Sequence, residues 1–394
     1  MPAEPAITFH AVARFPRGFR CASRNVGLKA DAPDLVLFTS EVDASAAAVF
    51  TRNLFPGAPV VLGRETIKGG RLRGIVANSK VSNVATGDAG LQNAKRMAAA
   101  AAKELGTSAD RMLVSSTGVI GVQLPIERIE TGLSGIATDL QDDPLVGAQA
   151  IMTTDTRPKT LSTSVGDATI TWVAKGAGMI EPNMATMLAY IFTDADLPAA
   201  TLDGMLRAAA RVSFNMLSVD SDTSTSDTCA ILANGLAGEV DTKAFSDALI
   251  AGCIRMAEML ARDGEGATRL LRICVRGAKT ATDARRIAKS LVNSPLVKTM
   301  VHGADPNVGR ILMAVGKCFD ATVVPAKTSA SINGLEVVKN GMRADFSDQS
   351  ARATLATDPV DIIVDLGVGG ETATAFGCDL SRGYIEENAA YYST

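Results

Sequence analysis

Short apolar runs alternate with longer amphipathic segments along most of the chain. Runs rich in Val, Ile, Leu or Phe predict strands, and apolar residues that recur every three or four positions predict helices. Strands are expected at residues 35–38, 60–62, 74–77, 112–115, 168–174, 187–193, 271–275, 321–324 and 361–365. Helices are expected at 91–105, 202–212 and 242–262, the last of them long and amphipathic. This mixed order predicts an α/β or α+β layered architecture, but it does not give the order of the strands.

The composition narrows the class of protein. Of 394 residues 47% are hydrophobic and only 4% aromatic, so the core must consist mainly of Ala, Val, Leu, Ile and Met. The length allows one large domain or two to three ordinary ones, and the apolar content is too high for a disordered chain. The net charge is −3 and no block of Lys and Arg stands out. Nucleic acid is therefore not expected as a partner, because phosphate binding needs a concentrated basic face.

The sequence carries no clear signal for a membrane or an oxidising compartment. No run reaches the roughly 18 apolar residues that span a bilayer. Residues 1–20 contain Glu4, His10 and Arg14 in place of the apolar centre of a signal peptide. Six cysteines without C-x-x-C spacing predict buried thiols in a reducing compartment, not a disulfide or zinc framework. We therefore expect a cytoplasmic protein without a membrane partner.

The most unusual segment is K-G-A-G-M-I-E-P-N-M-A-T-M-L at 175–188, a Gly- and Pro-rich loop that leads directly into an apolar strand. From the residues alone, it is either an ordinary surface loop before a core strand or a self-cleaving junction. In the second case backbone strain brings the Thr186 hydroxyl onto the carbonyl carbon of Ala185. An N→O acyl shift and hydrolysis then free Thr186 as a new N-terminus. Such a residue carries both a nucleophile and its own base, because an α-amine has a pKa of about 8.

This segment, with F-T-D-A at 192–195, resembles the autoprocessing signature of the ornithine acetyltransferases, also called glutamate N-acetyltransferases, of arginine biosynthesis. The resemblance extends over nearly the whole chain. Further matching motifs, in the same order, are S-S-T-G-V-I-G at 115–121, M-T-T-D-T at 152–156, D-S-D-T-S-T-S-D-T at 220–228, D-G-E-G-A-T at 263–268, N-S-P-L-V-K at 293–298, D-P-N at 305–307 and the C-terminal residues 384–394. With so many motifs matching in the same order, chance does not explain the resemblance.

The resemblance implies an α/β fold of the N-terminal-nucleophile type, with sheets sandwiched with helices. It also implies self-cleavage between Ala185 and Thr186 into an α-chain of 1–185, which carries the oxyanion turn, and a β-chain of 186–394, which starts with the nucleophile. Thr186 would take acetyl from N2-acetyl-L-ornithine and pass it to L-glutamate through an acetyl-enzyme, its α-amine accepting the proton. The resemblance further implies an α2β2 heterotetramer and no cofactor.

The T-G turn at a predicted strand end matches the family's oxyanion pair, Thr117 and Gly118. A hydroxyl and a backbone N–H there can both point at one developing O⁻. Many T-G pairs, however, merely terminate a strand.

Substrate-binding positions of the family fall on Thr153, Lys175, Thr186, Glu265, Asn388 and Ser393. We expect Lys175 to pair with a carboxylate, Glu265 with a cationic amine and Asn388 with amide groups. Taken singly, Lys175 and Glu265 would more often be solvated loop charges. Asn388 and Ser393 can contribute only if the C-terminal tail folds back over the pocket.

Other chemistries have weaker signals. The run Asp220 to Thr223 alternates oxygen ligands that suit Ca²⁺ or Mg²⁺, but it lacks the glycine and terminal glutamate of an EF-hand loop. A hydrogen-bonding polar turn that supports the nucleophile is the stronger interpretation. Two histidines, His10 and His302, leave little material for a Ser-His-Asp triad or a His-based zinc site, so no metal is expected.

Four positions depart from the commonest family sequence. Glu181 stands where a small residue is usual, Lys80 and Val81 replace Gly-Asn, and Val308 replaces a Trp. These changes leave Thr186 intact but put the acyl donor and acceptor in question. Open alternatives are therefore acetyl-CoA as a second donor, a paralogue of a secondary-metabolite pathway, an N-terminal-nucleophile aminopeptidase or amidase that passes the acyl group to water, and a non-catalytic scaffold.

Overall fold

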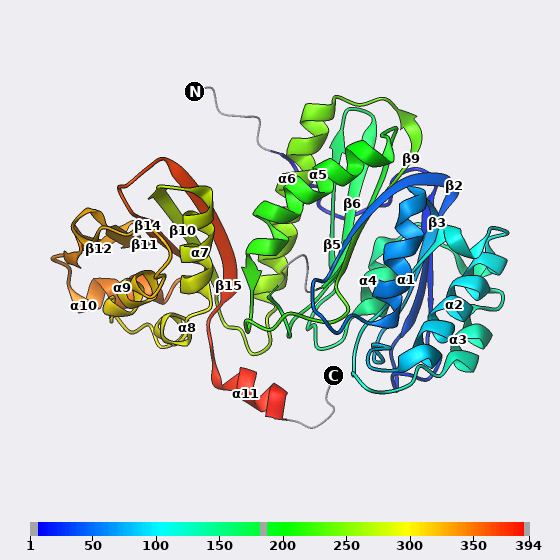
Figure 1. Ribbon diagram of the computed structural model, residues 1–394, viewed down its shortest axis with the longest axis horizontal. Coiled ribbons are helices and arrows are strands. Elements are labelled where there is room, and N and C mark those ends of the chain that lie inside the picture. Colours follow the sequence, from blue (N-terminus) through cyan, green and yellow to red (C-terminus); the bar gives the residue numbers. More distant parts are fainter. Residues whose placement is uncertain (1–6, 182–186, 390–394) are drawn as a thin grey trace.

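The computed structural model describes residues 7–181 and 187–389. In this part of the chain the strands form two sheets, with helices on and between them (Figure 1). The first sheet consists of β1 (Phe19–Arg24), β2 (Leu35–Phe50), β3 (Arg71–Asn78), β4 (Met112–Ser116), β5 (Lys159–Val165), β6 (Ala168–Lys175), β7 (Leu188–Ala195) and β9 (Thr228–Gly238). Its order is β4-β3-β2-β9-β7-β6-β5, with β1 paired to β2.

The second sheet is built from the C-terminal half of the chain. It consists of β8 (Leu217–Ser218), β10 (Leu270–Ala278), β11 (Ser329–Ile332), β12 (Leu335–Lys339), β13 (Met342–Arg343), β14 (Val360–Asp365) and β15 (Glu371–Cys378). Its order is β13-β12-β11-β14-β10-β15-β8. Both sheets mix parallel and antiparallel pairs: β7–β9 and β10–β14 are parallel, whereas β6–β7 and β10–β15 are antiparallel.

The helices complete the layers. They are α1 (Ala58–Thr66), α2 (Gly87–Glu104), α3 (Ile126–Leu133), α4 (Pro144–Ile151), α5 (Ala199–Val212), α6 (Thr242–Arg262), α7 (Ala281–Val292), α8 (Pro295–His302), α9 (Gly309–Gly316), α10 (Asp348–Leu355) and α11 (Arg382–Ala389). Helix α6 contacts β5 and β6 of the first sheet as well as β10 and β15 of the second, and α7 packs on β10 and β15. The two sheets are therefore joined through α6.

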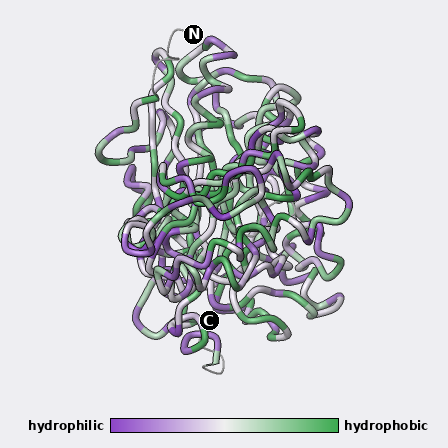
Figure 2. Tube along the Cα trace, turned by 90° about the vertical axis from the view of Figure 1, so that its left-hand side faces the viewer, coloured by the Kyte–Doolittle hydropathy of each residue, from purple (hydrophilic) through white to green (hydrophobic). Residues whose placement is uncertain are grey.

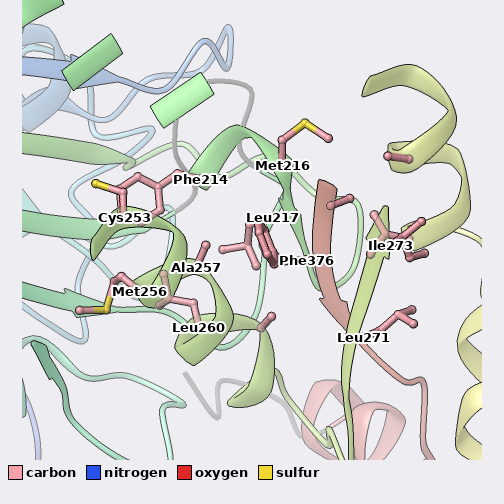
Figure 3. Packing of buried hydrophobic residues seen from close by; sticks show 14 of the residues in the cluster. Phe214, Met216, Leu217, Cys253, Met256, Ala257, Leu260, Leu271, Ile273 and Phe376 are labelled. Atoms are coloured by element: carbon pink, nitrogen blue, oxygen red, sulfur yellow. The ribbon is translucent and has the colours of Figure 1, made fainter. Parts of the chain in front are cut away.

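One hydrophobic cluster runs through this junction. It extends from Trp172 in the first sheet, through α6, to Phe376 in the second. Figure 3 shows Ala257 and Leu260 of α6 facing Leu217 and Phe376, and Figure 2 shows hydrophobic stretches running through the body of the molecule. Because α6 buries residues on both sides, the two sheets share this core, and the first sheet has two further clusters of its own.

Most of the predicted elements are confirmed, and two are wrong. The predicted strand at 60–62 lies inside α1, because Pro59 occupies the first turn, where a missing N–H costs nothing. Such a short apolar run cannot distinguish a strand from a buried helix. The predicted strand at 321–324 is irregular chain that ends at Pro325, the start of a 3₁₀ turn, Pro325–Lys327. The β-branched residues of this run favoured a strand, but residues next to a proline are poor hydrogen-bonding partners in a β-sheet.

The prediction of buried thiols is confirmed for five of the six cysteines. All six cysteines are unpaired, and all but the half-buried Cys274 are buried. Burial raises the pKa of Cys21 and of Cys253 to about 12, so these thiols are unreactive near neutrality. In the part of the chain that the structure describes, no helix combines the length and the apolar character needed to cross a membrane.

Candidate active site

The predicted site residues surround one cavity of about 180 Å³. Those within the described residues come from five separate segments: the turn after β4, the loop after α4, the end of β6, the loop after α6, and α11. They are Thr117, Gly118, Thr153, Lys175, Glu265 and Asn388. Met187, which follows the predicted nucleophile, lines the same cavity. Ala185, Thr186 and Ser393 lie outside the described residues.

The Thr117–Gly118 turn presents two donors to this cavity. Parallel pairing of β3 with β4 places Ser116 opposite Asn78, and the Thr117 N–H donates to the Asn78 carbonyl at 3.0 Å. Among residues 7–181 and 187–389, no partner engages the Thr117 hydroxyl or the Gly118 N–H. A hydroxyl and an amide N–H on adjacent residues are therefore available to a ligand oxygen, as an oxyanion hole requires.

The turn is held by the chain beneath it. Gly118 has φ 125°, and a Cβ there would overlap the backbone of Lys80, so only glycine fits. The Val119 N–H donates to the Lys80 carbonyl at 3.0 Å. The Asn78 amide donates to the Val81 carbonyl at 2.9 Å and accepts the Ser116 hydroxyl at 2.6 Å. The two donors are thus fixed before any substrate binds.

Lys175 provides a buried cation in the cavity. It is the last residue of β6, is 8% exposed, and donates from Nζ to Thr153 Oγ1 at 3.0 Å. Burial lowers its pKa below the ordinary value, while carboxylates nearby, Asp155 foremost, partly oppose this shift. Within the described residues Lys175 has no ion-pair partner. A buried ammonium without an ion-pair partner favours an anionic ligand group.

A buried ion network supports the loops around Lys175. Lys159 Nζ lies 2.6 Å from Asp155 Oδ1 and 2.5 Å from Asp263 Oδ2, and all three side chains are about 1% exposed or less. Asp155 also accepts the Gly176 N–H at 2.6 Å and the Thr153 N–H at 3.0 Å. Burial raises the pKa of Asp155, but the ammonium of Lys159 and hydrogen bonds outweigh this, so its pKa lies below the ordinary value. The network joins the 152–156 and 263–268 motifs, a role that the sequence analysis missed.

Glu265 lies opposite, held by two glycines and by the C-terminal helix. Its Oε2 accepts the Asn388 side-chain N–H at 2.7 Å, so α11 does fold back over the cavity. A Cβ at Gly178 would overlap the Glu265 carboxylate, and a Cβ at Gly266 would overlap the Tyr384 N atom. Glu265 is 6% exposed. The absence of a side chain at Gly178 and Gly266 therefore leaves room for the Glu265 carboxylate and for the start of α11 beside it.

This arrangement can be compared with known proteins. Residues 20–393 match the model of the ArgJ family. The chain belongs to the ArgJ family. It is 46% identical to the arginine biosynthesis bifunctional protein ArgJ 2 of Clostridium acetobutylicum, over 95% of this chain and 97% of that protein. It is 44% identical to the glutamate N-acetyltransferase Oat2 of Streptomyces clavuligerus, over 95% and 98%. A crystal structure of the ArgJ protein of Bacillus halodurans aligns at 38% identity and a TM-score of 0.50, over 51% of this chain and 98% of that one.

In this ArgJ protein the polar run at 220–228 holds the loop before the predicted cut. The Asp220 carboxylate accepts the Met179 N–H at 2.6 Å and the Ile180 N–H at 2.8 Å. The Asp222 carbonyl accepts the Glu181 N–H at 2.9 Å. These contacts fit the polar turn expected from the sequence. Residues 224–227 of the same run line the cavity, a contribution that the sequence analysis did not assign.

The positions at which this chain departs from the commonest family sequence lie in different parts of the structure. Lys80 has φ 77°, a backbone conformation that suits the glycine usual there. Val308 is 4% exposed and belongs to the main core. Glu181 makes side-chain contacts with the second sheet, as described below. Among these positions Lys80 and Val81 lie against the Thr117–Gly118 turn: the Lys80 backbone approaches Gly118, and Val81 forms a bridge with Val119.

Proposed function

We propose that this protein is an ornithine acetyltransferase of arginine biosynthesis that moves acetyl from N2-acetyl-L-ornithine to L-glutamate through an acetyl-Thr186 intermediate. ArgJ proteins are N-acetyltransferases, and relatives 46% and 44% identical over nearly the full chain carry the names given above. The observation that carries the proposal is the single cavity formed by predicted residues from five separate segments. Neither an amidase nor a scaffold is favoured over this function.

The first step of the proposal is self-cleavage at Ala185–Thr186, giving chains of 1–185 and 186–394. The Bacillus halodurans structure supports it, because its solved chain aligns almost completely while covering only 51% of this sequence. A separate polypeptide of about half the length is what such a cut produces. Met187, next to the new terminus, lines the cavity.

Acetyl transfer then needs a nucleophile, a base and an oxyanion site. The Thr186 hydroxyl attacks the acetyl carbonyl, and its own α-amine accepts the proton and later gives it to the leaving amine of ornithine. The Thr117 hydroxyl and the Gly118 N–H stabilise the O⁻ of each tetrahedral intermediate. In the second half-reaction the α-amine of glutamate attacks the acetyl-enzyme. Neither step needs a metal or a cofactor.

The charges in the cavity suit amino acids. Lys175 binds the α-carboxylate of the substrate, with Thr153 placing its ammonium, and Glu265 binds the side-chain ammonium of acetylornithine, with Asn388 placing its carboxylate. The volume of about 180 Å³ lies below the ~300–1,000 Å³ of pockets for drug-sized ligands. A small acyl-amino acid is therefore favoured over a peptide. Ser393 and Thr186 complete the binding set in this proposal.

Three further properties belong to the same proposal. Relatives are named bifunctional, and we propose acetyl-CoA as a second acetyl donor, which would make the enzyme also an N-acetylglutamate synthase. We expect an α2β2 heterotetramer in the cytoplasm. We also expect the small molecules above, and no nucleic acid or membrane, as its partners.

Mass spectrometry of the purified protein, before and after incubation with N-acetylornithine, tests the proposal. We expect masses for 1–185 and 186–394, and one acetyl group added to the second. Thr186→Ala should give one uncut chain without transferase activity, and a doublet in that variant would refute the assignment of the nucleophile. Glu265→Ala should weaken the use of acetylornithine more than it weakens self-cleavage, and equal loss of both would remove the binding role.

A further inference from the structure

The carboxylate of Glu181 connects the loop before the proposed cut to helix α7 on the second sheet. Its Oε1 lies 3.1 Å from Lys289 Nζ, and its Oε2 accepts hydrogen bonds from the Asn293 amide and, at 3.2 Å, from the Ser218 hydroxyl. The Glu181 and Lys289 side chains are 21% and 18% exposed, so the pair is largely shielded from water. Such a pair is held more firmly than an exposed ion pair, whose net contribution is small.

The backbone of Glu181 is fixed as well. Its N–H donates to the Asp222 carbonyl at 2.9 Å, and its carbonyl accepts the Thr223 hydroxyl at 2.8 Å. Ile180 and Thr223 form an antiparallel bridge beside it. Both backbone groups and the side chain of Glu181 are hydrogen-bonded, so this residue has little freedom. Through its side chain, the position of α7 constrains the loop before the proposed cut.

Lys289 is itself held for this contact. Its Nζ donates to the Leu217 carbonyl at 2.9 Å in addition to meeting Glu181. Burial lowers the pKa of Lys289, while the Glu181 carboxylate raises it, and the balance remains below the ordinary value. Losing Glu181 would leave this desolvated ammonium without a counter-charge, so each partner depends on the other.

Helix α7 lies in the C-terminal half of the chain, which is synthesised after Glu181 and the proposed cut. It packs on β10 and β15 of the second sheet and begins 100 residues after Glu181 in the sequence (Figure 1). We propose that Lys289 and Asn293 are positioning residues for self-cleavage. By binding the Glu181 carboxylate they hold the loop in the conformation that is cut, so the chain is cut only after the second sheet has folded. This inference rests on the proposed cut at Ala185–Thr186, and it concerns processing, not acetyl transfer.

The test follows cutting in freshly made precursor. Wild-type protein and Lys289→Met, Lys289→Arg and Arg286→Met variants are produced by cell-free translation, and loss of the full-length band is timed on denaturing gels. Arg286 is the matched control, because it lies on the same helix and pairs with exposed Asp320 at 3.6 Å. We expect Lys289→Met to slow cutting by about tenfold or more, the effect of losing a charge-assisted hydrogen bond. Lys289→Arg should restore most of the rate, and Arg286→Met should match wild type.

A second readout separates positioning from general damage. Lys289→Met protein that has finished cutting should show kcat and KM for acetylornithine within about twofold of wild type, since Lys289 lies outside the cavity. If Lys289→Met does not fold, Glu181→Gln replaces it, because the amide removes the charge and keeps the neighbours. Wild-type cutting rates in either folded variant overturn the inference and leave the proposed function standing. An uncut wild-type chain would instead refute the proposed function.

Discussion

Gly178→Ala isolates the contribution of Glu265 to substrate binding. A Cβ on Gly178 would lie closer than 3.0 Å to Cδ and both oxygens of Glu265, a separation that Cβ atoms essentially never show. The backbone of Gly178 is not in the left-handed region, so alanine itself is tolerated there. What must move is the end of a flexible side chain. The substitution therefore displaces the carboxylate, and with it the 2.7 Å hydrogen bond from Asn388.

The size of the effect follows from the interaction that is lost. A hydrogen bond to a charged group contributes about 1.5–3 kcal/mol, and each ~1.4 kcal/mol is a factor of ten in affinity. We expect KM for N-acetylornithine to rise about 10- to 100-fold. Because the contact is made equally in the bound substrate and the transition state, kcat should change little.

The assay is steady-state kinetics of the cut enzyme at saturating glutamate, with cutting confirmed on a denaturing gel. Gly204→Ala in α5 is the matched control, since a Cβ there meets nothing within 4 Å. A fully cut Gly178→Ala enzyme whose KM stays within twofold of wild type would show that Glu265 does not bind the amine. Slower cutting together with an unchanged KM of the cut fraction would assign Gly178 to the processing loop.

Three further predictions concern the groups around the cavity. Lys159→Met removes the cation that joins buried Asp155 and Asp263 and leaves Asp263 only the exposed Arg157 at 3.5 Å, so we expect the free energy of unfolding to fall by about 3–5 kcal/mol in chemical denaturation; a change below 1 kcal/mol would mean that water already solvates the network. Thr117→Val should lower kcat by roughly 10²–10³ with little change in fold, and a loss under tenfold would remove Thr117 from the oxyanion site. Because the pKa of Asp155 is depressed below 3.8 in the folded chain, its stabilising contribution is present above that value and lost as pH falls through the folded pKa. The unfolding temperature should therefore drop on acidification below about pH 4, and a flat profile there would contradict the shift.

Local signals predicted some elements well. Residues 242–262 form α6 with the expected bounds, because amphipathic spacing over many turns has no strand alternative. The prediction of a strand at 60–62 was wrong, because three apolar residues are too few to show a period. The neighbouring proline favours the first turn of a helix. The order of the strands could not be predicted, since it depends on pairs far apart in sequence, such as β2 with β9.

The residues that line the cavity were easier to predict than the residues that hold them in place. Thr117, Lys175 and Glu265 each stand in a short motif that matches the family, and the structure places them on one cavity. Lys159 stands outside the quoted motifs, yet its ammonium joins two buried carboxylates. Burial of a charge is a property of the assembled fold, so no local pattern indicates it.

The position of the proposed cut within the first sheet explains how a severed chain can keep its site. The sheet order is β4-β3-β2-β9-β7-β6-β5, so the two strands that follow the cut, β9 and β7, lie between β2 and β6, which precede it. Leu188 pairs with Lys175 on one side and with Thr228 on the other. Hydrogen-bonded ladders on both flanks therefore hold β7 after its link to β6 is broken. Leu188, two residues after the proposed new N-terminus, would stay paired with Lys175, and the cut would free an amine without freeing the chain that carries it.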